Sequence, residues 1–239
     1  VRGRAGISPM MLSAHQPAYL PWLGYLDKIA SADVFVFLDD VQFEKNSFIN
    51  RNRIKTSQGA QWLTVPVRMK GHMYATLLNT SMDDSQPWRR KHLAAVALNY
   101  RKARFFDYAY PRLEVLLGAA TQNLADFCWE QLRFWVAEFC IATRLVRQSQ
   151  APVEGTKSEL VLNLCLQQGA DAYLSGKLGR DYLDLASFEA RGIDVRFQQF
   201  NPQPYPQLWG AFEPGLSVLD YWMNCGPGKL ASRGGQNVL

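Results

Sequence analysis

Residues 33–38 form a short apolar run that ends in two aspartates, and this run constrains the fold more than any other part of the chain. Its β-branched and aromatic residues are typical of a strand buried on both faces of a parallel sheet. Another strand is predicted at residues 10–14, and helical spacing of apolar residues predicts a helix ending near Ser31. A strand, a helix and a buried strand in this order predict a right-handed βαβ unit.

Strands and helices continue to alternate after a mainly helical middle segment. Further strands are predicted at residues 61–67, 143–147, 172–174 and 194–200. Helices are predicted at residues 88–101, 110–117, 124–139, 157–168, 183–190 and 216–224. The fold class that this pattern indicates is α/β, with a mainly parallel Rossmann-like sheet and a helical insert or subdomain.

The domain organisation follows from the same pattern. We expect an N-terminal α/β half at residues 10–86, a helical insert at 87–141 and a C-terminal half at 142–228 that completes the same domain. Polar tails at residues 1–9 and 229–239 are predicted to be flexible. A chain of 239 residues is long enough to bury a substantial core in this way.

The net charge of +5 is compatible with an anionic ligand such as a nucleotide, a sugar phosphate or RNA. The basic residues are spread along the chain rather than gathered in one stripe, so the charge does not choose among these ligands. A local basic run at residues 88–92 is predicted to be the solvated start of a helix rather than a phosphate clamp.

The four cysteines are widely separated and lie among apolar neighbours, which predicts buried, reduced thiols rather than disulfides or a metal site. Apolar runs long enough to span a bilayer are missing from the sequence, and the N-terminus lacks the apolar core of a secretion signal. We therefore expect a cytoplasmic protein without a membrane partner.

Polar residues follow both strands of the predicted βαβ unit. His15 and Gln16 follow the first strand, and residues 39–42 follow the second. Because ligands of open α/β sheets bind at the carboxyl ends of the strands, the two groups are predicted to converge on one site. His15 could contact a phosphate there or act as an acid or base near neutral pH. The alternative is a histidine that is hydrogen-bonded only within its turn.

Asp39 and Asp40 belong to the second of these groups. Aspartates at a strand end can bind a metal, accept hydrogen bonds from a ribose or an amine, or cap the next element. Adjacent strand residues point to opposite faces, so at most one of the two is predicted to face a ligand.

Two further clusters are candidates for holding an anion. Residues 50–55 contain Asn50, Arg51, Asn52, Arg53 and Lys55, although a solvated loop is the alternative. Residues 175–182 combine two glycines, which let a ligand approach the backbone, with donors that suit phosphate or carboxylate. The donors in that loop are Ser175, Lys177 and Arg180. Its spacing is not that of a Walker A loop.

Several of these motifs together resemble the WbqC-like proteins. The resemblance covers residues 11–226 and is most specific in the first block, His-Gln-Pro-Ala-Tyr-Leu-Pro-Trp-Leu-Gly-Tyr at residues 15–25. It continues with Lys28-Ile29, Ala32-Asp33, Phe-Leu-Asp-Asp-Val-Gln at 37–42, Asn-Arg-Asn at 50–52, Trp-Leu-Thr-Val-Pro-Val at 62–67, Tyr-Leu-Ser-Gly at 173–176, Gly-Arg-Asp-Tyr-Leu at 179–183 and the block at 212–220.

The resemblance implies an enzyme of surface-polysaccharide or natural-product biosynthesis that attaches an acyl or aminoacyl group to an amine. His15 and one of Asp39 and Asp40 are the predicted catalytic residues. The predicted substrate-binding residues are Gln16, Tyr19, Trp22, Lys28, Gln42, Asn50, Arg51, Asn52, Lys55, Ser175, Gly176, Arg180, Asp181 and Tyr182. No metal-binding residue is assigned.

The order of elements also resembles the nucleotidylyltransferase-type α/β domains that form adenylates, in which an early histidine and a late basic loop hold the triphosphate. The expected partners are a small amine acceptor and an activated acyl or aminoacyl donor. The donor could be an amino acid with ATP or another nucleotide, an acyl thioester, or a charged tRNA. The alternative function is a non-catalytic module that binds a nucleotide sugar or RNA within a biosynthetic complex.

Overall fold

The central sheet has the strand order β5-β2-β1-β6-β7, and each of its pairings is parallel. We obtained a computed structural model of the chain, which describes residues 9–45, 47–68 and 76–230. The strands are β1 (Met11–His15), β2 (Val34–Phe37), β5 (Arg144–Arg147), β6 (Ala172–Ser175) and β7 (Asp194–Phe197). Counted along the chain, this is the 3-2-1-4-5 order of Rossmann-like sheets. The predicted α/β class and parallel sheet are confirmed.

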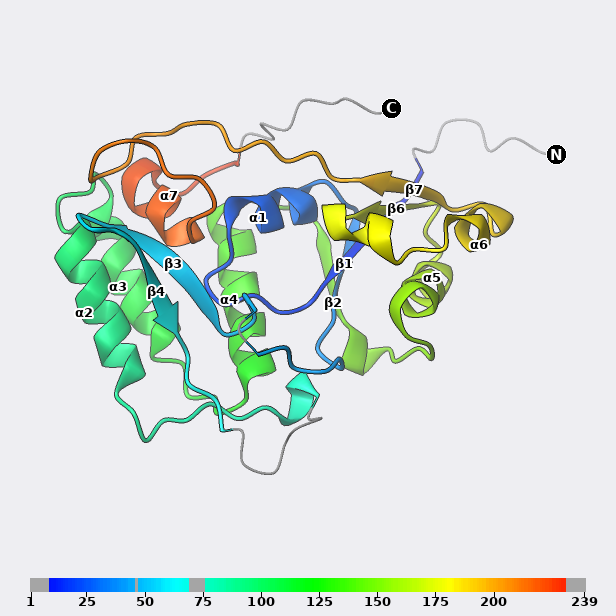
Figure 1. Cartoon of the computed structure of the whole chain (residues 1–239), viewed down its shortest axis with the longest axis horizontal. Coiled ribbons are helices and arrows are strands. Elements are labelled where there is room, and N and C mark those ends of the chain that lie inside the picture. The colour runs from blue at the N-terminus through cyan, green and yellow to red at the C-terminus, as the bar shows by residue number, and fades with distance from the viewer. Residues whose placement is uncertain (1–8, 46, 69–75, 231–239) are drawn as a thin grey trace.

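Strand β2 shows how the sheet separates two hydrophobic cores. Its alternate residues Val34 and Val36 pack in a core with α5 (Lys157–Gln168) and α6 (Leu185–Ala190). Phe35 and Phe37 pack in the other core with α1 (Leu23–Ala30) and α4 (Leu124–Glu138). In Figure 1, α5 and α6 lie at the right beside the sheet, and the remaining helices lie toward the left. The strand is therefore buried on both faces, as predicted.

A separate two-stranded sheet corrects one prediction. Strands β3 (Arg51–Thr56) and β4 (Gly59–Thr64) form an antiparallel hairpin outside the central sheet. The strand predicted at residues 61–67 overlaps β4, which ends at Thr64, and most of the residues interpreted as a polar cluster form β3. Ile54 and Leu63 are buried and hold the hairpin against the larger core, which explains why an apolar strand pattern occurs outside the sheet.

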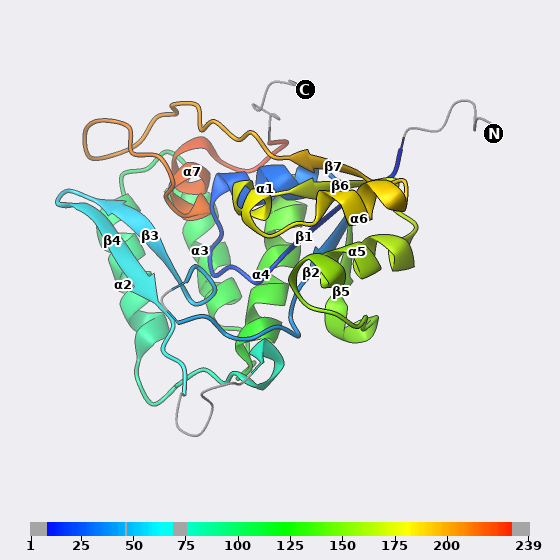
Figure 2. The ribbon, with the colours of Figure 1, turned by 45° about the vertical axis from the view of Figure 1, so that its right-hand side comes forward.

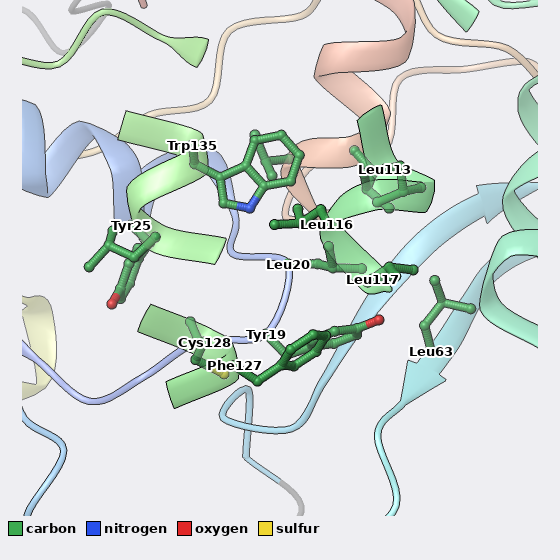
Figure 3. Close-up of a cluster of buried hydrophobic side chains, with 14 of the residues drawn as sticks. Tyr19, Leu20, Tyr25, Leu63, Leu113, Leu116, Leu117, Phe127, Cys128 and Trp135 are labelled. Carbon is green, nitrogen blue, oxygen red and sulfur yellow. The ribbon is translucent and has the colours of Figure 1, made fainter. Parts of the chain in front are cut away.

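The predicted helical insert contains α2 (Trp88–Tyr100), α3 (Phe106–Leu117) and α4. Helix α7 (Val218–Cys225) packs with them, and Figure 2 shows these helices grouped beside the β3–β4 hairpin. Short 3-10 helices lie at η1 (Leu77–Asn79), η2 (Gln148–Gln150) and η3 (Lys177–Asp181). The core that these elements share includes Tyr19 from the loop after β1, which lies against Phe127 of α4 (Figure 3).

The cysteine prediction holds only in part. The four cysteines form no disulfide, and Cys128 and Cys165 are buried, whereas Cys140 is exposed. Helices long and apolar enough to cross a membrane are missing among the described residues. The predicted tails fall almost wholly outside those residues.

Candidate functional site

The order of strands in the central sheet places the candidate site between β1 and β6. The chain passes from β1 to β2 on one side of the sheet centre, and the later strand β6 pairs with β1 on the other side. In Rossmann-like sheets, ligands bind outside the carboxyl ends of the strands at such a switch point, and the corresponding region of this chain is called the β1–β6 crevice below. His15 is the last residue of β1 and Ser175 is the last residue of β6.

The ring of His15 is held in one neutral form. Its Nδ1 donates to the carbonyl of Gln16 over 2.9 Å, and that carbonyl also accepts a hydrogen bond from the Tyr25 hydroxyl. Burial and the nearby charge of Lys28 lower the pKa of His15 to about 3, although the bond to Gln16 acts in the opposite direction. With the proton on Nδ1, the Nε2 lone pair can accept a hydrogen bond from a ligand.

Lys28 supplies a buried positive charge beside His15. Its side chain is in α1, and Nζ donates to the carbonyl of Ala14 at 2.9 Å, one residue before the end of β1. The residue is only 4% exposed, and burial lowers the pKa of its ammonium group to about 8. A Cβ placed on Gly176 would lie 4.0 Å from Nζ, so the ammonium group reaches the start of the loop after β6.

The loop after β6 is built closely around Ser175. This serine is buried, and its hydroxyl donates to the carbonyl of Gly176 at 3.1 Å. A Cβ on Gly179 would lie 1.9 Å from that hydroxyl oxygen, so only glycine fits there without a shift of the loop. Arg180 lies over the ring of Phe197 on β7, and Asp181 and Tyr182 are exposed beyond it. The loop thus borders the crevice with Ser175 and Gly176.

Comparisons with known proteins identify the family of the chain. The sequence profile described as the WbqC-like protein family matches residues 16–232, which begin directly after His15 and contain every described helix and strand except β1. The chain belongs to the WbqC-like family. The resemblance inferred from the motifs is confirmed.

A relative of this WbqC-like chain occurs in Mycobacterium tuberculosis (strain ATCC 25618 / H37Rv). It is named "Uncharacterized protein Rv1507c" and is 38% identical over 216 residues, which are 88% of this chain and 92% of the relative. No solved structure gives a significant match to the chain.

In the WbqC-like chain, the surroundings of Asp39 and Asp40 differ from those of the residues at the β1–β6 crevice. Asp39 is fully buried and accepts hydrogen bonds from Arg147 Nε at 2.6 Å, from the Ser149 amide at 2.9 Å and from the Ser149 hydroxyl at 2.7 Å. Arg147 also pairs with Asp126 at 2.7 Å. Asp40 is exposed, so the two carboxylates face different surroundings, as strand geometry predicts. The oxygens of Asp39 are occupied by the protein itself.

Most of the polar side chains in and just before β3 make hydrogen bonds that stabilise the fold. Asn50 donates to the Val65 carbonyl at 2.8 Å, and Asn52 donates to the Leu20 carbonyl at 2.7 Å. Lys55 is 3% exposed and donates to Gln207 at 3.0 Å and to the carbonyl of Ala211. In this structure the side chains of Asn50, Asn52 and Lys55 therefore hold neighbouring loops, and their role in ligand binding stays a prediction.

Two other predicted binding residues have different positions. Tyr19 is fully buried, and its hydroxyl lies 2.8 Å from Nδ1 of His92 in α2, so its ring cannot face a ligand in this conformation. Gln42 is exposed, and its backbone pairs with Thr76 in an isolated bridge. Neither borders β6. Among the described residues, no group of three or more His, Cys, Asp or Glu side chains is arranged to hold a metal ion.

A row of aromatic rings beside His15 was missed by the sequence reasoning except for Trp22. The Trp22 ring lies 5.8 Å from His15 and 5.2 Å from Phe48, and Phe48 lies 5.9 Å from Trp62. Phe48 is 40% and Trp62 43% exposed, which is unusual for side chains of this size. The guanidinium of Arg51 lies 4.3 Å from the Trp62 ring centre. The signal that could have revealed this row in the sequence is the presence of large aromatic residues within polar segments.

Proposed function

We propose that this WbqC-like protein is a biosynthetic enzyme that forms an amide by transferring an acyl or aminoacyl group to an amine, with the β1–β6 crevice as its active site. The observation that supports this most directly is the pairing of a neutral His15 with a buried ammonium group on Lys28. His15 offers an unprotonated nitrogen and Lys28 offers a positive charge, and both lie at the edge of the sheet where ligands of such folds bind.

The proposed reaction needs both groups. The amine lone pair attacks the acyl carbonyl carbon, and the carbonyl electrons move to oxygen to give a tetrahedral oxyanion. The Lys28 ammonium stabilises that oxyanion in a site with little water. As the oxyanion collapses, the bond to the leaving group breaks and the leaving group takes the electron pair. The amine proton passes to the lone pair on Nε2 of His15.

The leaving group suggests how the donor is activated. A phosphate ester or adenylate would place its anion between Lys28 and the backbone of Ser175 and Gly176, as in the nucleotidylyltransferase-type domains that the chain resembles. The row of Trp22, Phe48 and Trp62, of which the last two are exposed, suits a ring of the substrate, such as a base or a sugar. ATP with an amino acid is therefore the first donor to test, and an acyl thioester and a charged tRNA follow.

The proposal is tested by trapping the activated group with hydroxylamine, a small amine that forms a hydroxamate from any such donor. The protein would be incubated with ATP and the twenty amino acids, with acetyl coenzyme A, or with total charged tRNA. We expect the protein to raise hydroxamate formation from one of the three above the spontaneous reaction of that donor with hydroxylamine, and release of AMP or ADP identifies the first. His15→Ala should lower the rate by about a hundred-fold or more, whereas the exposed Asp40→Ala should retain it.

A His15→Ala protein that works at near wild-type rate would remove the central element of the mechanism. The second candidate function is a binding module for a nucleotide sugar or RNA, which the exposed aromatic row with Arg51 and Arg53 favours. It predicts stoichiometric binding without hydroxamate from any donor. Affinity that falls steeply with salt would then indicate contacts to nucleic-acid phosphates.

A further inference from the structure

A cavity lined by neither His15, Lys28 nor Ser175 lies between β4 and the first turns of α2. Its volume is about 350 Å³, and its lining includes Gln61, Trp62, Gln86, Trp88, Lys91 and His92. Strand β4 pairs with β3 along one edge, and residues 61–64 line the cavity with the other. The volume is at the lower end of the range for small-molecule sites, which fits a ligand of about ten heavy atoms.

The walls of the cavity are aromatic. Trp62 is 43% exposed on one side, and Trp88 is buried on the other, with its indole N–H already donated to Asp84 at 2.9 Å. Because this N–H is satisfied, Trp88 offers the cavity an apolar surface. Flat and aliphatic groups are favoured between walls of this kind.

The floor of the cavity carries no charge. His92 is 5% exposed, its Nδ1 lies 2.8 Å from the Tyr19 hydroxyl, and its ring is also hydrogen-bonded to the backbone of Thr64. Burial lowers its pKa to about 4, so the ring is neutral at physiological pH. Figure 3 shows the Tyr19 hydroxyl pointing toward β4, where Leu63 lies. The His92 ring at the floor of the cavity is thus already hydrogen-bonded within the protein and has no polar atom left for a ligand.

The rim of the cavity is different, because two of its polar side chains are uncommitted. Lys91 and Gln61 are exposed, and their side chains make no hydrogen bond or ion pair within the part of the chain that the structure describes. Helix α2 has no acidic residue in its first turn and no side-chain cap at its start. The ammonium group and the positive end of the helix both favour an anion. One free ammonium matches the single charge of a carboxylate better than the double charge of a phosphate.

We propose that this cavity binds a small carboxylate with a flat or apolar body. The carboxylate faces Lys91 and the start of α2, the Gln61 amide donates to it, and the body lies between Trp62 and Trp88. The site does not depend on the reaction assigned to His15, since it uses neither His15 nor Lys28. Trp62 is the one side chain that also belongs to the aromatic row considered for the substrate.

The test is a ligand-detected NMR titration with benzoate and with benzamide, its uncharged isostere, in the full-length protein at constant salt. Benzoate should bind with a dissociation constant of about 1 mM, as expected for a ligand of this size. Benzamide should bind about three- to five-fold more weakly, which is the contribution of an exposed ion pair. Lys91→Gln should weaken benzoate binding by the same factor and leave benzamide unchanged.

Matched variants control for the fold and for the location. Lys102→Gln removes an exposed lysine near the other end of α2 and should leave benzoate binding as in the wild type. Ala95→Trp fills the cavity and should abolish binding of both probes, whereas Leu98→Trp changes an exposed position of the same helix and should not. Lys91 is exposed, so its variant tests the proposal even if Ala95→Trp fails to fold.

Three results would overturn the assignment: no saturable binding of benzoate, equal binding by the Lys91→Gln and Lys102→Gln proteins, or loss of binding in His15→Ala. Loss of binding in His15→Ala would mean that benzoate binds in the β1–β6 crevice instead. Because the titration measures binding without turnover, failure here leaves the hydroxamate result standing, and failure of the hydroxamate assay leaves this result standing.

Discussion

Two neighbouring regions at the same edge of the sheet carry similar polar residues and differ in what those residues have left to offer. At the ends of β2 and β5, each oxygen of Asp39 is bonded to Arg147 or Ser149. At the ends of β1 and β6, the His15 ring uses only Nδ1, in a hydrogen bond to the carbonyl of the next residue, Gln16, and Lys28 reaches toward Gly176. The first region is a closed network that stabilises the fold. The second retains unshared capacity and is the better candidate for binding.

The difference teaches that a polar strand end is not by itself a site. A buried carboxylate that is fully hydrogen-bonded is a structural element, because a ligand would have to displace bonds that the protein already makes. The neutral imidazole of His15, beside the buried ammonium group of Lys28, still has a nitrogen that can accept a hydrogen bond from a ligand. Stability measurements on the two regions should therefore respond differently to substitution and to pH.

The largest expected effect is on the closed network. Asp39→Ala leaves Arg147 partly buried with only Asp126 as a partner, so the free energy of unfolding should fall by about 3 to 5 kcal/mol. Urea unfolding at pH 7, followed by tryptophan fluorescence, measures it. Asp40→Ala, at an exposed position, should stay within about 0.5 kcal/mol of the wild type. Equal stabilities of the two variants would contradict the division into a structural and a binding region.

The next effect concerns the charge at the open region. The unfolded chain protonates Lys28 with a pKa of 10.5 and the folded chain with a pKa of about 8. Between these values the unfolded state binds more protons, so stability rises with pH across this window. The difference is 2.5 pH units, and the wild type should gain about 3 kcal/mol over Lys28→Met between pH 7 and pH 10.5.

Urea unfolding at several pH values measures this gain, and Lys102→Met serves as the matched control because Lys102 is exposed. The control should follow the wild-type pH profile. Parallel profiles for the wild type and Lys28→Met would show that Lys28 is not buried as the structure has it.

A smaller effect is expected from His15 in acid. The folded chain keeps this ring neutral down to a pKa of about 3, while the unfolded chain takes up a proton near 6.5, so stability falls as the pH drops below 6.5. Because the side chain is partly exposed, we expect about 1 to 2 kcal/mol between pH 7 and pH 4.5. His15→Asn should lose correspondingly less stability. Acid unfolding of both proteins, monitored by circular dichroism, would refute this if the losses were equal.

The smallest effect returns to the closed network. Ser149→Ala removes one hydroxyl from Asp39 but keeps the Ser149 amide and Arg147 in place, so the loss should be about 1 kcal/mol. Ser57→Ala, in the exposed turn of the hairpin, should cost nothing measurable. A loss from Ser149→Ala as large as that from Asp39→Ala would mean that the hydroxyl, rather than the ion pair, holds the network together.

Much of the fold was predictable because it depends on local patterns. The helix at residues 157–168 has the predicted bounds, and β1 and β2 lie within about two residues of theirs, an ordinary error for element ends. His15 was placed at a strand end, and its position there is confirmed. The hairpin was not recognised, because two short strands with mixed polarity resemble a loop followed by a sheet strand until their partner is known.

The candidate site was predictable in its first half only. Residues 15–28 are local in the chain, so the strand end and the helix that carry His15 and Lys28 could be inferred together. Tyr19, Asn52 and Lys55 looked equally polar or aromatic, but they are buried by contacts with α2, the loop at Leu20 and the segment near Gln207. Burial of this kind depends on distant segments, which a single sequence does not reveal.

The sequence by itself determined the alternation of strands and helices, the parallel sheet and the family, because each depends on periodicity or on contiguous motifs. Only the tertiary structure decided that β6 pairs with β1 and that Arg147 reaches Asp39. The partners in these contacts are more than 100 residues apart. Whether a polar side chain is free for a ligand depends on which distant groups satisfy its hydrogen bonds. That depends on strand order, and strand order is a property of the folded chain.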